Sequence, residues 1–232
     1  MADDLDPPQA SADDAIRTAI KATVAAIPVV GGSAAEILEA VIASPLQKRR
    51  DEWCEVVASA IRRLQSEHGI RVEELRDNPV FVDCVLQASQ IAVRNSQSEK
   101  RDALRNAVLN AGLPHSPEES IQQVFLGYVD AFTVWHLRLL ALFDDPPAWF
   151  AAQGRSSPDF HSGSLSAVIR NAFPELGEPR EFTDQVWRDL YSRGLVNTEN
   201  LHTMMTGSGC LSRRTTDSGR RFVQFVSAPA RA

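Results

Sequence analysis

The longest regular pattern in the sequence is an apolar stripe near the middle of the chain. Its members alternate steps of four and three residues, a spacing that keeps side chains on one face of an α-helix. They are Ile121, Phe125, Tyr128, Phe132, Trp135, Leu139 and Leu142. Ser116-Pro117 is a typical helix start, and Asp145-Pro146 is a typical stop. The stripe therefore predicts one long central helix with a buried apolar face.

Helix-start and helix-stop signals recur through the first 145 residues. Ser44, Asn78 and Ser96 are candidate N-caps, and Gly69 and Gly112 are candidate C-terminal glycines. Alternating runs of β-branched residues are almost absent from this part of the sequence. We therefore expect residues 11–145 to form at least five helices and no sheet, as a helical bundle after a disordered tail over residues 1–10.

Residues 12–43 contain two apolar helical patterns joined by Val29-Val30-Gly31-Gly32. The stretch 22–35 carries no charged residue. One interpretation is a hairpin that packs on the bundle. The other is a hairpin that detaches and inserts shallowly into a membrane surface, as an effector protein requires.

The pattern changes after residue 145. Residues 146–163 are rich in proline, glycine and serine and are predicted to be a linker. Residues 164–232 then show two short helical patterns, a glycine-rich segment at 206–209 and a last helix from Asp217. We expect the glycine-rich segment to be a hairpin tip and all β-structure to lie between about 195 and 216. The fold class is therefore mainly α, a helical bundle followed by a small winged-helix-like α+β module.

Two motifs carry that last expectation. The segment DLYSRGLV at 189–196 resembles the end of a winged-helix helix, L-x-x-x-G-L-V. The segment RTTDSGRRF at 214–222 is similar to the L-T-x-x-G-R-x-F start of the helix that follows the wing. The resemblance covers about a quarter of the chain and implies the order helix, helix, wing, helix.

The whole plan resembles bacterial abortive-infection alpha-type proteins, which combine a helical body with a small winged C-terminal module. The resemblance implies a role in phage defence and implies no catalytic residues. In such proteins the winged module need not touch DNA. The sparse lysines and abundant alanines also favour a bacterial, GC-rich source.

The charge distribution limits nucleic-acid binding to the C-terminal module. The chain has a net charge of −6, whereas residues 151–232 hold ten arginines against eight acidic residues. A winged-helix DNA binder would place the 180–193 helix in the major groove and use Arg213 and Arg214 on the wing for phosphates. The candidate contacts to nucleic acid or to a partner are Arg180, Arg188, Arg193, Arg213, Arg214 and Arg220. Acidic residues on the same helix argue against DNA.

Two further features allow both a structural and a functional interpretation. Lys48, Arg49 and Arg50 lie in the first turn of a predicted helix, where the macrodipole disfavours cations. They form either a solvated face or a contact with a partner or lipid headgroups. His136 follows Trp135 on the predicted central helix. It is either a histidine at the edge of the core with its hydrogen bonds satisfied, or part of a functional site.

The sequence offers no array for catalysis or metal binding. Cys54, Cys84 and Cys210 are far apart, which is typical of free thiols in a reducing cytosol. The histidines are dispersed, and no nucleophile elbow or phosphate-binding glycine loop is present. We therefore expect a cytoplasmic protein that is not an enzyme, with no cofactor, no metal and no small-molecule substrate.

Three functions follow from these observations. The first is a non-enzymatic interaction protein, in phage defence or stress, that binds a protein partner or itself. The second is a winged-helix transcriptional regulator, although the net charge predicts weak DNA binding. The third is a membrane-perturbing effector that uses residues 12–43.

Overall fold

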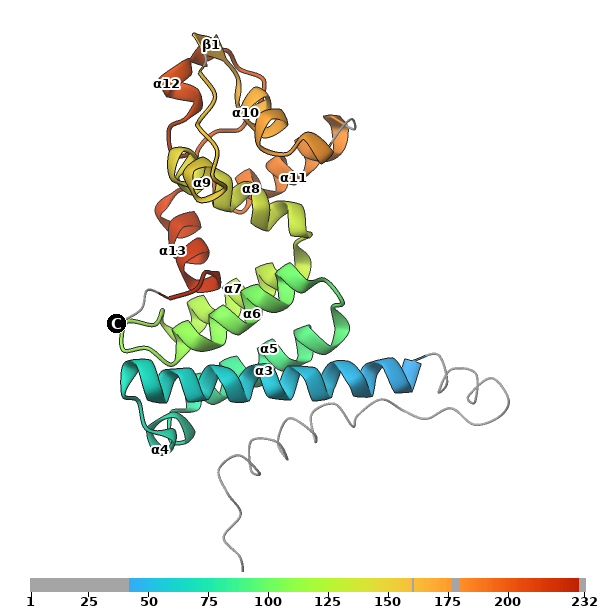
Figure 1. Cartoon of the computed structure of the whole chain (residues 1–232), viewed down its shortest axis with the longest axis vertical. Coiled ribbons are helices and arrows are strands. Elements are labelled where there is room, and N and C mark those ends of the chain that lie inside the picture. The colour runs from blue at the N-terminus through green and yellow to red at the C-terminus, as the bar shows by residue number, and fades with distance from the viewer. Residues whose placement is uncertain (1–41, 160, 177–179, 230–232) are drawn as a thin grey trace, which may run out of the picture. The chain divides into compact units, whose positions relative to one another are not determined.

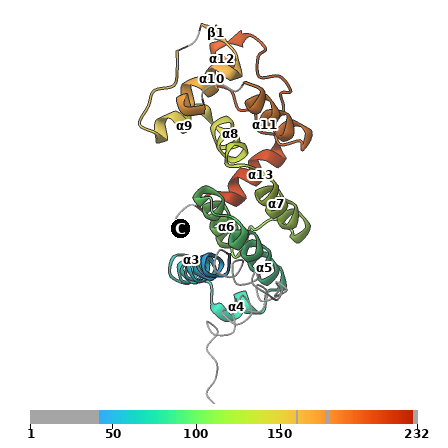
Figure 2. The ribbon, with the colours of Figure 1, turned by 90° about the vertical axis from the view of Figure 1, so that its right-hand side faces the viewer.

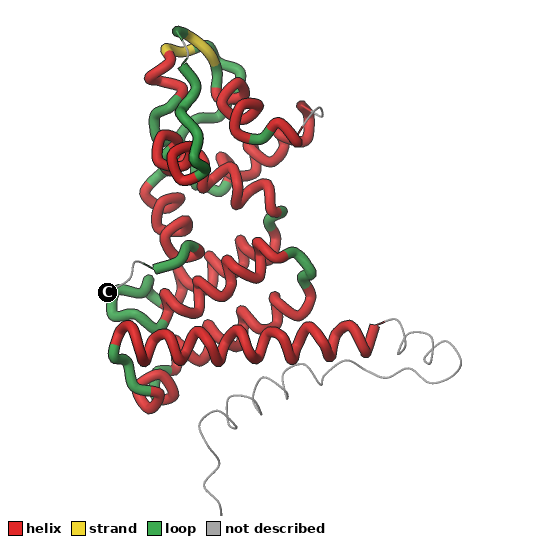
Figure 3. Tube along the Cα trace, viewed as in Figure 1, coloured by secondary structure: helices red, strands yellow, loops and turns green. Residues whose placement is uncertain are grey.

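The computed structural model describes residues 42–159, 161–176 and 180–229 (Figure 1). This part of the chain contains eleven α-helices and one two-stranded sheet, drawn in red and yellow in Figure 3. The predicted mainly helical class is confirmed. The chain divides into two compact units, Met1–Asp130 with Val226–Ala232 and Ala131–Phe225. We expected the bundle to continue to residue 145, whereas the units divide at Asp130.

The described part of the N-terminal unit is made of helices only. They are α3 (Ser44–His68), α4 (Val72–Arg76), α5 (Pro79–Arg94), α6 (Ser98–Ala111) and α7 (Glu119–Ala131). Helices α3, α5 and α6 pack against one another (Figure 2). With α8 of the other unit, residues 42–145 thus hold six helices and no strand, as predicted.

One buried hydrogen-bond chain joins α3 to α5 in the core of this unit. The Trp53 indole N–H donates to Ser89 Oγ at 2.8 Å. The Ser89 hydroxyl in turn donates to the Val85 carbonyl at 2.6 Å. Each polar atom in this series of hydrogen bonds has a partner. The large Trp53 side chain is therefore fully buried without leaving its indole N–H unsatisfied.

Some predicted helix ends are confirmed and others are wrong. The Asn78 side chain accepts a hydrogen bond from Phe81 N at 3.2 Å, as an N-cap does. Gly69 has a φ of 66°, the left-handed conformation that ends many helices. By contrast, neither Ser44 nor Ser96 is an N-cap, because α3 follows Ala43 and α6 follows Gln97. Most of the apolar hairpin over residues 12–43 lies outside the described residues.

The C-terminal unit contains shorter elements. They are α8 (Val134–Asp144), α9 (Pro146–Ala152), β1 (Ser162–Gly163), α10 (Leu165–Ala172), η2 (Pro174–Leu176), α11 (Arg180–Ser192), β2 (Met205–Thr206), α12 (Gly207–Cys210) and α13 (Asp217–Val226). Strands β1 and β2 pair antiparallel, with Ser162 opposite Thr206 and Gly163 opposite Met205. A separate antiparallel bridge joins Val196 to Thr215.

The predicted long central helix is wrong in one respect, because it breaks into α7 and α8. Thr133 is the N-cap of α8, and its backbone N–H donates to His136 Nδ1 at 3.1 Å. This reciprocal capping box supplies a partner for the amide at the break. The apolar stripe continues across it, so Phe125, Phe132 and Leu139 are still buried. Ile121 and Trp135 are only half-buried.

Three expectations for the C-terminal part are also corrected. The predicted linker contains α9, whose N-cap Asp145 accepts from Ala148 N at 3.1 Å. The predicted hairpin tip at 206–209 is instead the start of α12, capped by the Thr206 side chain. Strand β1 lies before the 195–216 window in which we expected all β-structure.

The two motifs of the winged-helix resemblance pack on each other. Thr216 donates its backbone N–H to Leu195 O at 3.0 Å and its hydroxyl to Gly194 O at 2.6 Å. A Cβ on Gly219 would lie 2.0 Å from the Leu195 carbonyl oxygen. Only glycine allows this approach of α13 to the end of α11.

Truncation of Phe132 tests the packing of the C-terminal unit. Its ring stacks on His136 with centroids 4.5 Å apart and meets the edge of Phe222 at 6.1 Å, and the residue is 3% exposed. We expect Phe132→Ala to lower the free energy of unfolding by about 3–5 kcal/mol. The matched control is Phe182→Ala, because Phe182 is 37% exposed and its truncation leaves no comparable cavity. Equal losses for the two variants in denaturant titrations would contradict this packing.

Candidate functional site

A hollow of about 570 Å³ lies in the C-terminal unit, among α10, η2, the first turns of α11 and the loop before β2. Its volume is in the range of small-molecule sites. One wall is apolar and is formed by Ile169, Phe173, Leu176 and Leu201. The polar side is formed by Ser166, Arg170, Arg180, Thr183, Asp184 and His202. This is the candidate functional site.

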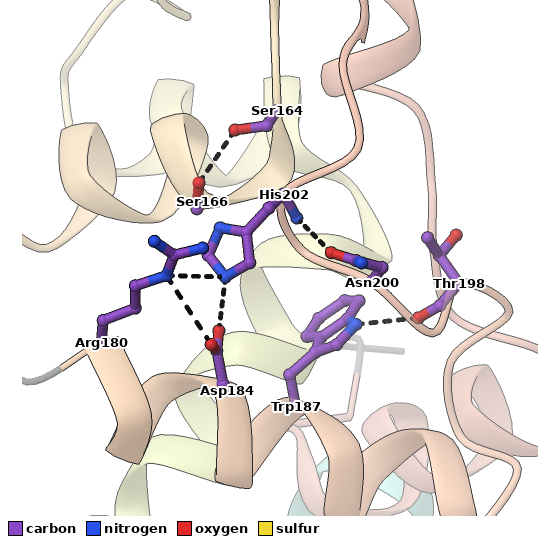
Figure 4. A network of polar contacts seen from close by, with 8 residues as sticks. All are labelled: Ser164, Ser166, Arg180, Asp184, Trp187, Thr198, Asn200 and His202. Atoms are coloured by element: carbon purple, nitrogen blue, oxygen red, sulfur yellow. Dashed lines mark hydrogen bonds and ion pairs between the residues drawn. The ribbon is translucent and has the colours of Figure 1, made fainter.

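Three side chains meet at the polar side of the hollow (Figure 4). His202 Nε2 lies 2.7 Å from Asp184 Oδ1. Arg180 Nε lies 3.3 Å from the same histidine nitrogen and 3.8 Å from Asp184 Oδ2. With Asp184 ionised, the 2.7 Å contact requires that His202 Nε2 carries a proton. Nε2 then has no lone pair for Arg180, so the Arg180 contact is not a hydrogen bond.

Two hydrogen bonds to backbone groups hold the loop that carries His202. The His202 amide donates to Asn200 Oδ1 at 2.7 Å, which forms an Asx turn. The buried Trp187 indole N–H donates to the Thr198 carbonyl at 2.8 Å. Both contacts are drawn in Figure 4, and both fix the histidine over α11.

Of these three residues, only Arg180 was predicted from the sequence to be a contact residue. Asp184 belongs to the acidic residues of α11 that argue against DNA, and His202 is one of the dispersed histidines. The partners Asp184 and His202 are 18 positions apart, across a loop whose path the sequence does not specify. The turn signal at Asn200 was the only local indication that the chain reverses here.

The two arginines expected on the wing bind the unit's own atoms. Arg213 Nε donates to the Asp144 carbonyl and lies 3.7 Å from the Asp144 carboxylate. The Arg214 guanidinium donates to the carbonyl of Gly209 and lies 3.4 Å from Thr198 Oγ1. The half-buried Arg214 is therefore occupied within the fold.

The other predicted arginines have separate neighbours. Arg188 donates to Gln185 Oε1 at 2.9 Å on the exposed side of α11. The Arg193 guanidinium lies 5.2 Å from the centroid of the Phe132 ring. Arg220 is half-buried on α13. Arg180, Arg188, Arg193, Arg213 and Arg214 thus contact different parts of the unit.

The basic cluster at the start of α3 belongs to the N-terminal unit. Lys48 is exposed, whereas Arg49 and Arg50 are half-buried. The prediction that they lie in the first turn is wrong, because α3 begins at Ser44 and these residues occupy its second turn. The two alternatives, a solvated face and a contact with a partner or lipid, both stay predictions.

His136 is buried, and of its two ring nitrogens only Nδ1 has a hydrogen-bond partner among the described residues. Its Nδ1 accepts from the Thr133 amide, so the neutral ring carries its proton on Nε2, which lies 3.5 Å from Asp189 Oδ2. Burial lowers the pKa of His136, and the nearby Asp189 carboxylate opposes this shift only in part. These contacts favour a structural role, as the capping partner of Thr133.

The described residues show no group of histidine, cysteine and acidic side chains that could bind a metal ion. No described helix is long and apolar enough to cross a membrane. No protein family, no curated protein and no solved structure matches the chain.

The lowered pKa of His136 makes stability depend on pH. Because the unfolded state binds this proton more readily, we expect the free energy of unfolding to fall as the pH drops through and below the ordinary histidine pKa of about 6.5. His136→Gln should show a smaller loss between pH 7.5 and 5.5 than the parent protein. Denaturant titrations at both pH values measure the difference, and equal losses in the two proteins would contradict this account.

Proposed function

We propose that the chain is a non-enzymatic bacterial interaction protein that acts through protein contacts of its C-terminal unit. The observation that carries this proposal is the occupancy of Arg213 and Arg214. Both guanidinium groups donate to backbone carbonyls of the same unit. A phosphate would have to displace these contacts, and the arginines that a winged-helix protein would offer to DNA are therefore poorly available.

The charge of the unit points the same way. Residues 131–225 hold ten arginines and ten acidic residues, so the unit as a whole is neutral. A dedicated nucleic-acid-binding surface carries an excess of basic residues. A neutral surface with interspersed charges is better matched to a protein than to a polyanion.

The exposed side of α11 is the surface we propose for the partner. It presents Glu181 and Arg188, charges of opposite sign. The aromatic residues Phe182 and Tyr191 on the same helix are 37% and 40% exposed. Arginine and aromatic residues are enriched in protein interfaces, where they combine contact area with hydrogen bonds.

We also infer that the unit is winged-helix-like. The order β1, α10, α11, the Val196–Thr215 bridge and α13 supports this interpretation. So does the packing of Gly219 against Leu195, which links the two motifs that suggested it. In this proposal the wing is a structural element that the hydrogen bonds of Arg214 hold in place. DNA binding is the alternative function.

A role in phage defence or stress, in the cytoplasm, rests on the resemblance to abortive-infection proteins. The membrane-perturbing alternative depends on residues 12–43, most of which lie outside the described residues. Lys48, Arg49 and Arg50 begin five positions after the end of that segment and would be its contact with lipid headgroups or a partner.

A DNA titration separates the first two functions. At physiological salt we expect a dissociation constant for duplex DNA weaker than about 10 μM, with a salt slope of about −2, the value for residual phosphate contacts by Arg213 and Arg214 alone. Fluorescence anisotropy with random duplex and promoter DNA of the host measures both values. Sub-micromolar, sequence-selective binding with a slope steeper than about −5 would instead establish a DNA-binding regulator.

Affinity purification from the host then tests the protein surface. The variant Glu181→Arg with Arg188→Glu exchanges two exposed charges on α11 and keeps the net charge. The matched control, Asp217→Arg with Arg221→Glu, makes the same exchange on α13. We expect a partner that the parent and the control recover equally and the α11 variant at least tenfold less. Equal recovery with all three proteins would overturn the proposed surface.

A further inference from the structure

We propose that the hollow between α10 and α11 binds an amphipathic organic anion, a carboxylate or phosphate monoester attached to an apolar body. The inference is independent of the proposed function, because it concerns the inner side of α11 and not its exposed face. The sequence alone indicated no small-molecule ligand. The structure adds a cavity of about 570 Å³ with chemically distinct walls.

The cationic side of the cavity lacks good internal acceptors. Arg180 has only the Asp184 carboxylate within ion-pair distance among the described residues, at 3.8 Å, and its side chain is 69% exposed. Its contact with His202 is donor to donor, because His202 Nε2–H donates a hydrogen bond to the ionised Asp184 carboxylate. Arg170 is also exposed on this wall and has no described carboxylate within ion-pair distance. The guanidinium groups of Arg170 and Arg180 thus have N–H donors available for a ligand.

Asp184 is the one acidic side chain among the described residues that line the cavity, and it does not repel such a ligand strongly. Asp184 is held by His202 at 2.7 Å and by the approach of Arg180. Two arginines therefore face one carboxylate that already has a hydrogen-bond donor. The remaining charge is positive, and a ligand carboxylate or phosphate matches the fork of an arginine better than the distant Asp184 oxygen does.

The opposite wall is suited to an apolar group. Ile169, Phe173 and Leu201 are 2–7% exposed, so they form a packed surface behind the cavity, and Leu176 of η2 extends it. Water against such a wall gains little from hydrogen bonding, and an alkyl or aromatic group that displaces it is favoured. The cavity therefore selects a molecule that is anionic at one end and apolar at the other.

Calorimetric titration of the full-length protein with octanoate and octyl phosphate tests this site. We expect one molecule of each anion to bind per chain. The neutral 1-octanol and the cationic octylammonium should bind at least tenfold more weakly, because neither can accept from the arginines as an anion does. The ratio of the two anion affinities shows whether a carboxylate or a phosphate is preferred.

Two variants assign the binding to this cavity. Arg170→Gln with Arg180→Gln should weaken both anions at least tenfold. Arg62→Gln with Arg221→Gln removes the same charge from exposed positions elsewhere and should leave the affinities unchanged. Thermal melts of both variants establish that they are folded. Absence of anion binding to the parent, equal affinity for 1-octanol, or equal weakening by the two variants would each overturn the proposal.

Discussion

The C-terminal unit depends on the contacts of Arg214. Its guanidinium donates to the carbonyl of Gly209 in α12 and lies within 3.4 Å of Thr198 Oγ1 and 3.2 Å of Met205 Sδ. Its backbone amide donates to Phe143 O in α8, and its carbonyl accepts from Asn197 N, both at 2.8 Å. One residue thus joins α8, the chain after α11, β2 and α12. A half-buried charge requires such partners, since desolvation without them is costly.

This arrangement connects the wing to the candidate site. The segment from Asn197 to Thr206 is held at its start by two contacts: Asn197 N donates to Arg214 O, and the Trp187 indole donates to Thr198 O. His202 lies on this segment and reaches Asp184 on α11. The arginine that sequence analysis assigned to phosphate binding therefore supports the loop that forms one wall of the cavity.

The sequence was informative where a local pattern decides the structure. Apolar periodicity predicted the helices, and the buried Phe132 and Leu139 follow the stripe. The stripe could not reveal the break before α8, because the apolar periodicity continues across it. The local signal for a helix start there is the pair Thr133 and His136, which have the spacing of a capping box.

The candidate site could not be predicted in full from the sequence, because long-range contacts form it. The six candidate arginines were selected by charge alone, and charge does not distinguish Arg188, on the surface, from Arg214, which is engaged in the fold. The glycine-rich segment allowed both a hairpin and a helix turn. Thr206, whose hydroxyl accepts from Gly209 N at 3.2 Å, is the residue that favours the helix. Asp184 and His202 meet only because the intervening chain is held in place.

The most direct test of the structural role of Arg214 is the free energy of unfolding of Arg214→Gln. Loss of its charged hydrogen bonds should cost at least about 1.5 kcal/mol. The exposed Arg221→Gln should stay within about 0.5 kcal/mol of the parent in the same denaturant titration. An Arg214→Gln protein that unfolds like the parent but loses affinity for duplex DNA would contradict the account and return Arg214 to the role of a phosphate contact.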